Sequence, residues 1–209
     1  MHLKRNEMPK SWPLAKKGTK YIVRPLHNLQ KSIPLLIILR DILKIVQNKK
    51  EVKKLLHLKK IKVNCKIVNE EKFSLMLFDI ISLDNKDFRL ILKNKKFSLQ
   101  EINEKETKEK IVKVIGKKIL KGKKLQVNLN DGRNFLYNEK LATGDSVIID
   151  LKENKISKIL PFKEGSKVIF ISGKYIGEEG KIEKIEKNIM VKVGQIKINA
   201  RKENLMVVE

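Results

Sequence analysis

The segment SIPLLIILRDILKIVQNKKEVKKLLHLKKIKVNCKIV, residues 32–68, passes from a helical to an alternating apolar pattern and therefore indicates an α+β fold. Its first part predicts a helix, with Ser32 as the candidate N-cap and Pro34 in the first turn. The apolar residues at helical spacing are Leu35, Ile38, Leu39, Ile42, Leu43 and Val46. The unbroken apolar run, Ile33 to Leu39, is far shorter than the roughly 18 residues that a membrane span needs, so we expect no membrane helix.

A second helix is predicted from Asn48, which reads as an N-cap with Glu51 as its partner three residues on. Val52, Leu55 and Leu56 form its apolar stripe. The opposite face is cationic and consists of Lys49, Lys50, Lys53, Lys54, His57 and Lys60. Such a face can meet several phosphates at once and release counterions. The alternative is an ordinary solvated helix face, and a membrane-surface helix is disfavoured because the apolar stripe is short and needed for the core.

A short hairpin follows the cationic helix, because Ile61, Val63 and Ile67 alternate around a turn at Asn64-Cys65. Cys65 is the only cysteine, which excludes an internal disulfide and any zinc site with several cysteines. The three histidines are too scattered for the usual metal-ligand spacings, so we expect no metal and no cofactor.

Beyond Phe73 the sequence is mostly strand-like, which predicts a central antiparallel β domain. Asn130-Asp131-Gly132 is a strong hairpin turn within it. Residues 100–110 are highly charged and predict a short exposed helix. The expected strands are Leu75 to Leu83, Phe88 to Leu92, Ile111 to Ile115, Leu125 to Leu129, Arg133 to Tyr137 and Ser146 to Asp150.

A last unit of about 45 residues begins after Pro161, near the size at which a core alone becomes marginal, so docking on a neighbour would help it. Its expected strands are Lys167 to Ile171, Lys181 to Glu186, Ile189 to Val193, Ile196 to Asn199 and Met206 to Val208. Gly173, Gly177 and Gly180 shape a loop in which Lys174 and Tyr175 would supply a phosphate contact and a stacking surface. Plain turn chemistry is the alternative, and Glu178 beside Glu179 weakens an RNA contact there.

The first 31 residues carry prolines, a glycine and cations without a sustained period, so we predict an extended basic arm lying over the protein or over RNA. Trp12 is among its apolar anchors. The cations assigned here to RNA binding, together with Arg40 in the first helix, are Lys4, Arg5, Lys10, Lys16 and Lys17.

The chain of 209 residues carries 48 Lys and Arg against 24 Asp and Glu, a formal net charge of +24 that indicates a polyanionic partner. Residues 1–60 are the most basic part, with 16 basic and 3 acidic side chains. Lys far outnumbers Arg, which favours phosphate contact over base reading, although a lysine-rich coding bias would also raise the count. Hydrophobic residues make up 41%, too many for a disordered tail. No secretory signal is visible, so a cytoplasmic location is expected.

Two parts of the chain resemble known RNA-binding families. Residues 33–68, with the cationic helix and Val63-Asn64, are similar to the S4-type RNA-binding domain, although Cys65 stands where that family usually has Gly. A left-handed backbone at a cysteine would cost roughly 1 kcal/mol or more. The series Gly165, Val168, Ile171, Gly173, Gly177, Gly180 and Ile182 resembles the KOW motif of ribosomal proteins and transcription elongation factors.

The order of the parts resembles the family of small-subunit ribosomal protein four of the archaeal and eukaryotic type. The phrases that carry this are His2-Leu3-Lys4-Arg5, Ile33-Pro34-Leu35, Phe78-Asp79-Ile80-Ile81-Ser82-Leu83, Phe88-Arg89-Leu90 and Gly144-Asp145-Ser146. The resemblance implies a non-enzymatic structural constituent of the small ribosomal subunit that binds ribosomal RNA and neighbouring ribosomal proteins. It also implies a division into arm 1–31, S4-type domain 32–70, central β domain 71–160 and SH3-like KOW barrel 161–209.

Two other functions remain as alternatives at this point. An RNA-modifying enzyme is disfavoured, because the order Asp131-Gly132-Arg133 does not match the catalytic order of pseudouridine synthases. A small-molecule or nucleotide substrate is not indicated, because Gly122-Lys123 is wrongly spaced for a phosphate-binding loop. A free transcription or translation factor that uses the KOW unit is the second alternative.

Overall fold

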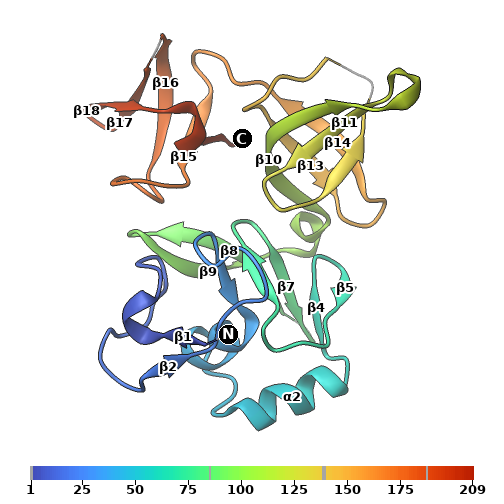
Figure 1. The fold of residues 1–209 in the computed structure, drawn as a ribbon, viewed down its shortest axis with the longest axis vertical. Coiled ribbons are helices and arrows are strands. Elements are labelled where there is room, and N and C mark those ends of the chain that lie inside the picture. Colours follow the sequence, from blue (N-terminus) through green and yellow to red (C-terminus); the bar gives the residue numbers. More distant parts are fainter. Residues whose placement is uncertain (1, 85, 138–139, 187) are drawn as a thin grey trace. The chain divides into compact units, whose positions relative to one another are not determined.

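The structure is a computed structural model that describes residues 2–84, 86–137, 140–186 and 188–209, with only the backbone at Glu104, Lys105 and Lys123 (Figure 1). The architecture is α+β and mostly strand. It consists of two compact units, Met1–Lys108 and Glu109–Glu209. Within the described residues, no helix is long and apolar enough to cross a membrane.

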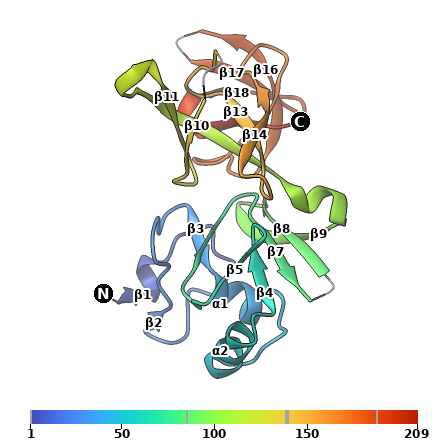
Figure 2. The same cartoon turned by 90° about the vertical axis from the view of Figure 1, so that its right-hand side faces the viewer.

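The first unit is built on antiparallel strands, with the short helices α1 and α2 lying next to each other (Figure 2). One sheet has the order β5-β4-β7-β8-β9, and β1-β2 and β3-β6 form separate pairs. The elements are β1 (Leu3–Lys4), the 3-10 helix η1 (Arg5–Glu7), β2 (Tyr21–Ile22), β3 (Ser32–Pro34), α1 (Leu35–Ile37), the π-helix η2 (Ile38–Ile42), α2 (Lys49–His57), β4 (Ile61–Val63), β5 (Lys66–Ile67), β6 (Ser74–Met76), β7 (Ile80–Leu83), β8 (Lys86–Lys93), β9 (Lys96–Ile102) and the 3-10 helix η3 (Glu104–Lys108).

The predicted first helix is wrong in its start and its length. Ser32 does not cap a helix but lies in β3, where it pairs with Met76 of β6, and its carbonyl accepts a hydrogen bond from Trp12 Nε1 at 2.8 Å. The residue before a proline favours extended backbone, so Ile33-Pro34 continues this strand and the helix begins only at Leu35. Every residue from Ser32 to Leu39 is buried, so the short helix that follows β3, α1 continued by η2, starts within the core and is not a long amphipathic helix.

The second helix forms as predicted. The Asn48 side chain accepts hydrogen bonds from Lys50 N at 3.0 Å and Glu51 N at 3.1 Å. The Glu51 carboxylate accepts in return from Gln47 N at 2.7 Å and from Asn48 Nδ2 at 2.8 Å. Val52 and Leu56 are buried, and Leu55 is half-buried. Cap and stripe therefore fix both the start of α2 and its orientation.

The hairpin β4–β5 turns at Asn64-Cys65, as predicted, with φ of +50° and +63°. Asn64 is buried, its Nδ2 donates to Asp79 Oδ1 at 2.7 Å, and its Oδ1 accepts from Ile80 N at 3.0 Å. These bonds tie the turn to the start of β7 and hold Cys65 in a left-handed conformation that a cysteine adopts at a cost.

One strand prediction and one helix prediction in this unit need correction. The expected strand Leu75 to Leu83 is broken into β6 and β7, because Phe78 takes a positive φ of +64° between them. The short helix expected over residues 100–110 is present but is confined to η3, because β9 extends to Ile102 and β10 begins at Glu109. Strand pairing with β8 overrides the local charge there.

The second unit contains two antiparallel sheets, with the orders β12-β11-β10-β13-β14 and β18-β17-β16-β15-β19. The predicted turn at Asn130-Asp131-Gly132 joins β11 to β12, with Gly132 at φ +85°. The elements are β10 (Glu109–Ile119), the 3-10 helix η4 (Lys121–Lys123), β11 (Leu125–Leu129), β12 (Asn134–Leu136), β13 (Ser146–Asp150), β14 (Lys155–Leu160), β15 (Lys167–Phe170), β16 (Glu179–Ile185), β17 (Ile189–Val193), β18 (Ile196–Ala200), the 3-10 helix η5 (Lys202–Asn204) and β19 (Leu205–Val207).

The last strands dock on the preceding sheet, as the small size of the C-terminal part predicted. Successive residues of β13 point to opposite faces of the sheet. Val147 and Ile149 therefore pack in the apolar cluster of the β10–β14 sheet, and Ile148 packs in the cluster of the last strands. The buried Lys113 Nζ donates to the carbonyl oxygens of Lys202, Glu203 and Leu205 at 2.6, 3.0 and 2.7 Å. Packing and these bonds make residues 109–209 one compact unit.

Candidate nucleic-acid interface

Helix α2 presents its cations on the side opposite its buried stripe. Lys50, Lys53, Lys54 and His57 follow the spacing i, i+3, i+4 and i+7 and are all exposed. Among the residues that the structure describes, no carboxylate lies within 4.0 Å of Lys50, Lys53 or Lys54 Nζ. Three adjacent ammonium groups on one face therefore remain available to an external anion.

The two cations at the ends of this face are engaged inside the chain. Lys49 Nζ lies 2.6 Å from Glu71 Oε1, and the Glu71 side chain is only 9% exposed. Lys60 Nζ lies 3.5 Å from Asp84 Oδ2. The predicted set on α2 thus divides into Lys50, Lys53, Lys54 and His57, which point outward, and Lys49 and Lys60, which pair with carboxylates.

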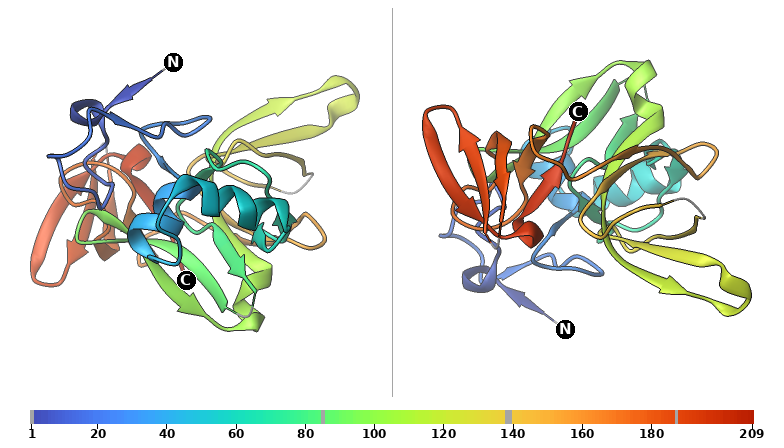
Figure 3. Two further views of the ribbon diagram at one scale, coloured as in Figure 1. Left: turned by 90° about the horizontal axis from the view of Figure 1, so that it is seen from below. Right: turned by 90° about the horizontal axis from the view of Figure 1, so that it is seen from above.

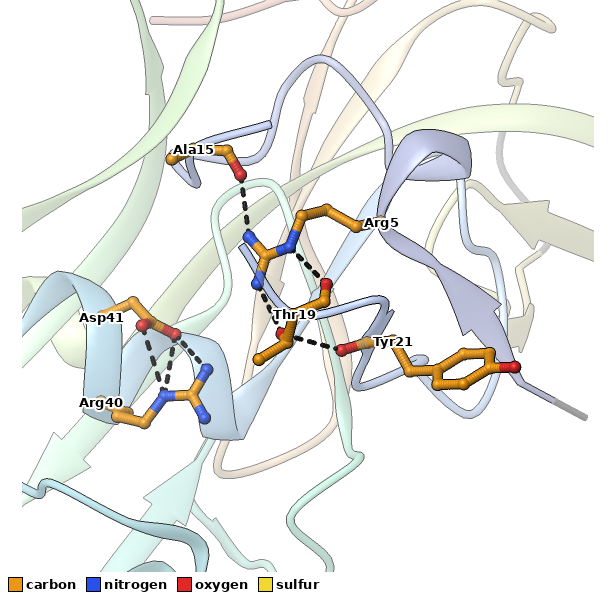
Figure 4. A network of polar contacts seen from close by, with 6 residues as sticks. All are labelled: Arg5, Ala15, Thr19, Tyr21, Arg40 and Asp41. Carbon is orange, nitrogen blue, oxygen red and sulfur yellow. Dashed lines mark hydrogen bonds and ion pairs between the residues drawn. The ribbon is translucent and has the colours of Figure 1, made fainter. Parts of the chain in front are cut away.

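Arg5, a predicted RNA contact, forms hydrogen bonds within the arm (Figure 4). Its Nε and Nη1 donate to the carbonyl oxygens of Thr19 and Ala15, and its Nη2 donates to Thr19 Oγ1, each at 2.8 Å. Gly18 lies against the guanidinium, where an added Cβ would come within 3.0 Å of Arg5 Cζ. Arg5 therefore uses its fork of donors to close the loop of residues 15–19.

Arg40 is likewise paired, with Nη2 2.8 Å from Asp41 Oδ2 (Figure 4). The remaining predicted cations of the arm, Lys4, Lys10, Lys16 and Lys17, are exposed. The arm itself is folded against the first unit, because Leu3 and Trp12 are 3% and 1% exposed and Phe97 N donates to Ser11 O at 2.7 Å.

The glycine-rich loop predicted between β15 and β16 has the tight backbone that its glycines allow. Gly173 and Gly177 take φ of +96° and +85°, and an added Cβ at Gly180 would lie 2.6 Å from Lys192 O. Lys174 is exposed, with Nζ 5.6 Å from the centre of the Tyr175 ring. Tyr175 is half-buried, and its ring centre lies 6.0 Å from that of Phe170, so it packs on the core and leaves little ring free for stacking.

Several other lysines of the second unit are paired with carboxylates on the surface. Lys197 Nζ lies 2.8 Å from Glu183 Oε2, and this hydrogen bond, helped by the charges of Lys192 and Lys184, holds the pKa of Glu183 below its ordinary value. Lys155 pairs with Glu153, and Lys158 with Glu209. These cations are locally neutralised, in contrast to those on α2.

The hairpin of β10 and β11 carries exposed cations that we did not single out from the sequence, namely Lys117, Lys118, Lys121 and Lys124. One signal could have identified them, since the sequence has no acidic residue between Glu109 and Asp131. Within the described residues, no three or more His, Cys, Asp or Glu form a group that could hold a metal ion.

Comparison with known proteins gives consistent results. The model of the ribosomal family S4e matches residues 84–156. The chain is 35% identical over 191 residues to the small ribosomal subunit protein eS4 of Methanocella arvoryzae, with 88% of this chain and 81% of that protein covered. It is 35% identical over 217 residues to the same-named protein of Korarchaeum cryptofilum, with 99% and 92% covered. The crystal structure of the 30S ribosomal protein S4e from Thermoplasma acidophilum superposes with a TM-score of 0.75 at 26% identity, covering 86% of this chain and 95% of that one.

Proposed function

The chain belongs to the ribosomal family S4e and is a structural constituent of the small ribosomal subunit, and we propose that it holds ribosomal RNA mainly through backbone phosphates bound by helix α2. The observation that supports this site is the exposed row of Lys50, Lys53 and Lys54, none of which has a described carboxylate within 4.0 Å of Nζ, although Glu70 and Glu71 line a pocket beside Lys53. Each ammonium that replaces a condensed counterion on a phosphate contributes favourable entropy.

The geometry of α2 suits backbone binding better than base reading. Lys ends in a compact ammonium without the planar fork that Arg uses for bidentate contacts. The Asn48 cap and the buried Val52 and Leu56 fix the helix, so its cations are aligned before RNA arrives. We add His57 and the arm residues Lys4, Lys10, Lys16 and Lys17 as peripheral contacts, with Lys174 as a contact from the C-terminal loop.

We also propose the finer division of the chain that the resemblance implies. The helix α2 followed by hairpin β4–β5 supports an S4-type RNA-binding domain over 32–70, after an arm over 1–31. Pairing of β19 with β15 supports an SH3-like KOW barrel over 161–209, after a central β domain over 71–160. Strands from both sides of residue 70 share one sheet, so the S4-type and central segments are joined closely in the first unit.

The proposed setting is the cytoplasmic ribosome, with small-subunit ribosomal RNA and neighbouring ribosomal proteins as partners and without catalysis. A free transcription or translation factor would separate from ribosomal subunits on sedimentation. A constituent of the small subunit should instead remain with small subunits after a moderate salt wash.

Site-specific photo-crosslinking tests the position of the RNA. A photoreactive amino acid replaces Lys53 in the full chain, and in a control it replaces Lys155, which is also exposed but paired with Glu153. After incorporation into small subunits, we expect Lys53 to give crosslinks to ribosomal RNA and Lys155 to give few. Crosslinks from Lys155 alone would contradict the α2 site, and failure of the unmodified protein to join small subunits would contradict the function itself.

A further inference from the structure

The hairpin of β10 and β11 carries a second group of cations that is separate from α2. Between Glu109 and Asp131 the sequence contains no acid, and its lysines are Lys110, Lys113, Lys117, Lys118, Lys121, Lys123 and Lys124. Lys110 and Lys113 are buried and engaged, the former in an ion pair with Asp131 at 3.0 Å and the latter with backbone carbonyls. Lys118, Lys121 and Lys124 lie beyond Val127, the core residue of β11 nearest the turn, and Lys117 pairs with Val127.

The distal part of the hairpin extends away from the rest of the second unit as a two-stranded ribbon (Figure 3). Val114 of β10 is 0% exposed, whereas Ile119 at the end of the same strand is 76% exposed. Lys117 pairs with the buried Val127, and beyond this pair Lys118 pairs with Gln126 and Ile119 with Leu125. No core covers this end, so the unit does not need its length for packing.

The cations are distributed around the ribbon. Successive strand residues point to opposite faces, so Lys117 and Lys118 project on its two sides. Lys121 and Lys124 lie at the turn, which a hydrogen bond from Leu120 N to Lys124 O closes at 2.8 Å. Gly122 takes φ +78° at the tip, with no atom within 4 Å of an added Cβ. For Lys117, Lys118, Lys121 and Lys124, no carboxylate among the described residues comes within 4.0 Å.

The composition of the ribbon indicates which form of RNA it fits. Proteins that bind single strands stack the bases on aromatic side chains. The sequence from Leu99 to Asn134 contains no aromatic residue, and Phe135 packs on the core cluster. Double-helical RNA instead presents rows of phosphates on either side of a groove and is bound largely by shape and backbone. A ribbon with ammonium groups on both faces can reach two such rows.

We propose that the distal β10–β11 hairpin is a second RNA-binding element, which takes a double-helical segment of RNA by its phosphates. This inference rests on the proposed function, since it specifies a further contact of the same RNA partner. It assigns the hairpin a role of its own, because its four exposed lysines belong to the second unit, whereas Lys50, Lys53 and Lys54 belong to the first.

Binding of defined RNA probes tests the proposal. The variant Lys117→Gln, Lys118→Gln, Lys121→Gln and Lys124→Gln is compared with a control that neutralises four paired surface lysines: Lys86, Lys155, Lys158 and Lys197. Both sets remove the same charge from the full chain. The probes are a 20-base-pair RNA duplex and a polyuridine strand of equal length, and anisotropy gives affinity as a function of salt.

For the duplex, we expect the slope of log affinity against log salt to fall by about three units in the hairpin variant, and by less than one in the control. The polyuridine slope should change far less. Equal slopes for hairpin variant and control on the duplex would overturn the inference while leaving α2 untouched. Equal losses on duplex and polyuridine would overturn its preference for double helices. If the wild-type chain binds neither probe nor small subunits, the proposed function fails instead.

Discussion

The N-terminal arm and helix α2 are both rich in positive charge, but they use that charge differently. In the arm, Arg5 donates three hydrogen bonds to the loop that contains Ala15 and Thr19. In α2, Lys50, Lys53 and Lys54 point outward and meet no described carboxylate. In the arm, Arg5 therefore stabilises the local fold, whereas helix α2 holds its lysines exposed to solvent.

This difference shows that net charge overstates the charge available for binding. Arg40, Lys49, Lys60, Lys110 and Lys113 are also engaged within the chain. A planar guanidinium suits internal bonding because its donors are fixed in direction, whereas an exposed lysine stays mobile and hydrated. The predictions that follow test this division, from the largest expected effect to the smallest.

The arm is part of the folded unit, so removal of its buried anchor should destabilise that unit. Trp12 is 1% exposed, and its Nε1 donates to Ser32 O. We expect Trp12→Ala to cost about 3 to 5 kcal/mol, measured by chemical denaturation. Leu26→Ala is the matched control on the same arm, because Leu26 is 53% exposed and should change little. Equal stability of both variants would show that the arm does not belong to the core.

Arg5→Lys separates charge from geometry in the arm. It keeps the positive charge but loses the fork that reaches Ala15 and Thr19, so we expect a loss of about 1 to 2 kcal/mol of local stability. Hydrogen exchange over residues 15–21 should therefore become faster, while the salt dependence of RNA binding stays unchanged. A changed salt slope with unchanged exchange would instead show that Arg5 contacts RNA.

Asn48→Ala tests the alignment of the cations on α2. Loss of the N-cap should destabilise the helix by about 1 kcal/mol and speed exchange in its first turn. RNA affinity should fall modestly, because the lysines are no longer held in one row. Asn48→Asp, which keeps a capping oxygen, should restore the exchange rates. Unaltered exchange in Asn48→Ala would show that the cap does not stabilise α2.

The smallest effect concerns a paired lysine in the second unit. Lys197→Gln removes the hydrogen bond that lowers the pKa of Glu183, so that pKa should rise toward its ordinary value, as NMR titration of the carboxyl carbon would show. A carboxylate with a lowered pKa stabilises the fold above its unfolded pKa, and this contribution is lost as the pH falls through the folded pKa. As the pH falls, the wild-type chain should thus lose a small stabilisation that the variant does not have. An unchanged Glu183 titration would argue against the pairing.

Local signals in the sequence predicted the parts of the structure that local physics determines. The cap at Asn48, the stripe through Val52 and Leu56 and the turn at Asn130-Asp131-Gly132 each require only neighbouring residues. The strand β3 could not be predicted in this way, because residues 32–39 are all buried and pairing with the distant β6 decides the conformation of Ser32–Pro34. Strands β9 and β14 were missed, since lysines and other polar residues interrupt their alternation.

The residues of the candidate site divide in the same way, into those that local sequence predicts and those whose role depends on folding. The cationic face of α2 follows from helical period alone, and its exposed residues lie where they were predicted. The internal roles of Arg5 and Arg40 depend on partners brought close by folding, so an isolated sequence cannot reveal them. The lysines of the β10–β11 hairpin lie in an acid-free stretch that the sequence shows, but their position outside the core follows only from the folded structure, in which Ile119 is exposed.

The salt dependence of ribosomal RNA binding tests most directly whether displayed charge, rather than total charge, binds RNA. The variant Lys50→Gln, Lys53→Gln and Lys54→Gln is compared with Lys155→Gln, Lys158→Gln and Lys197→Gln, whose lysines are paired with carboxylates. We predict that the slope of log affinity against log salt falls by about two units for the α2 variant and by less than one for the control. Equal falls in the two variants would mean that bulk charge binds the RNA and that the α2 site is wrong.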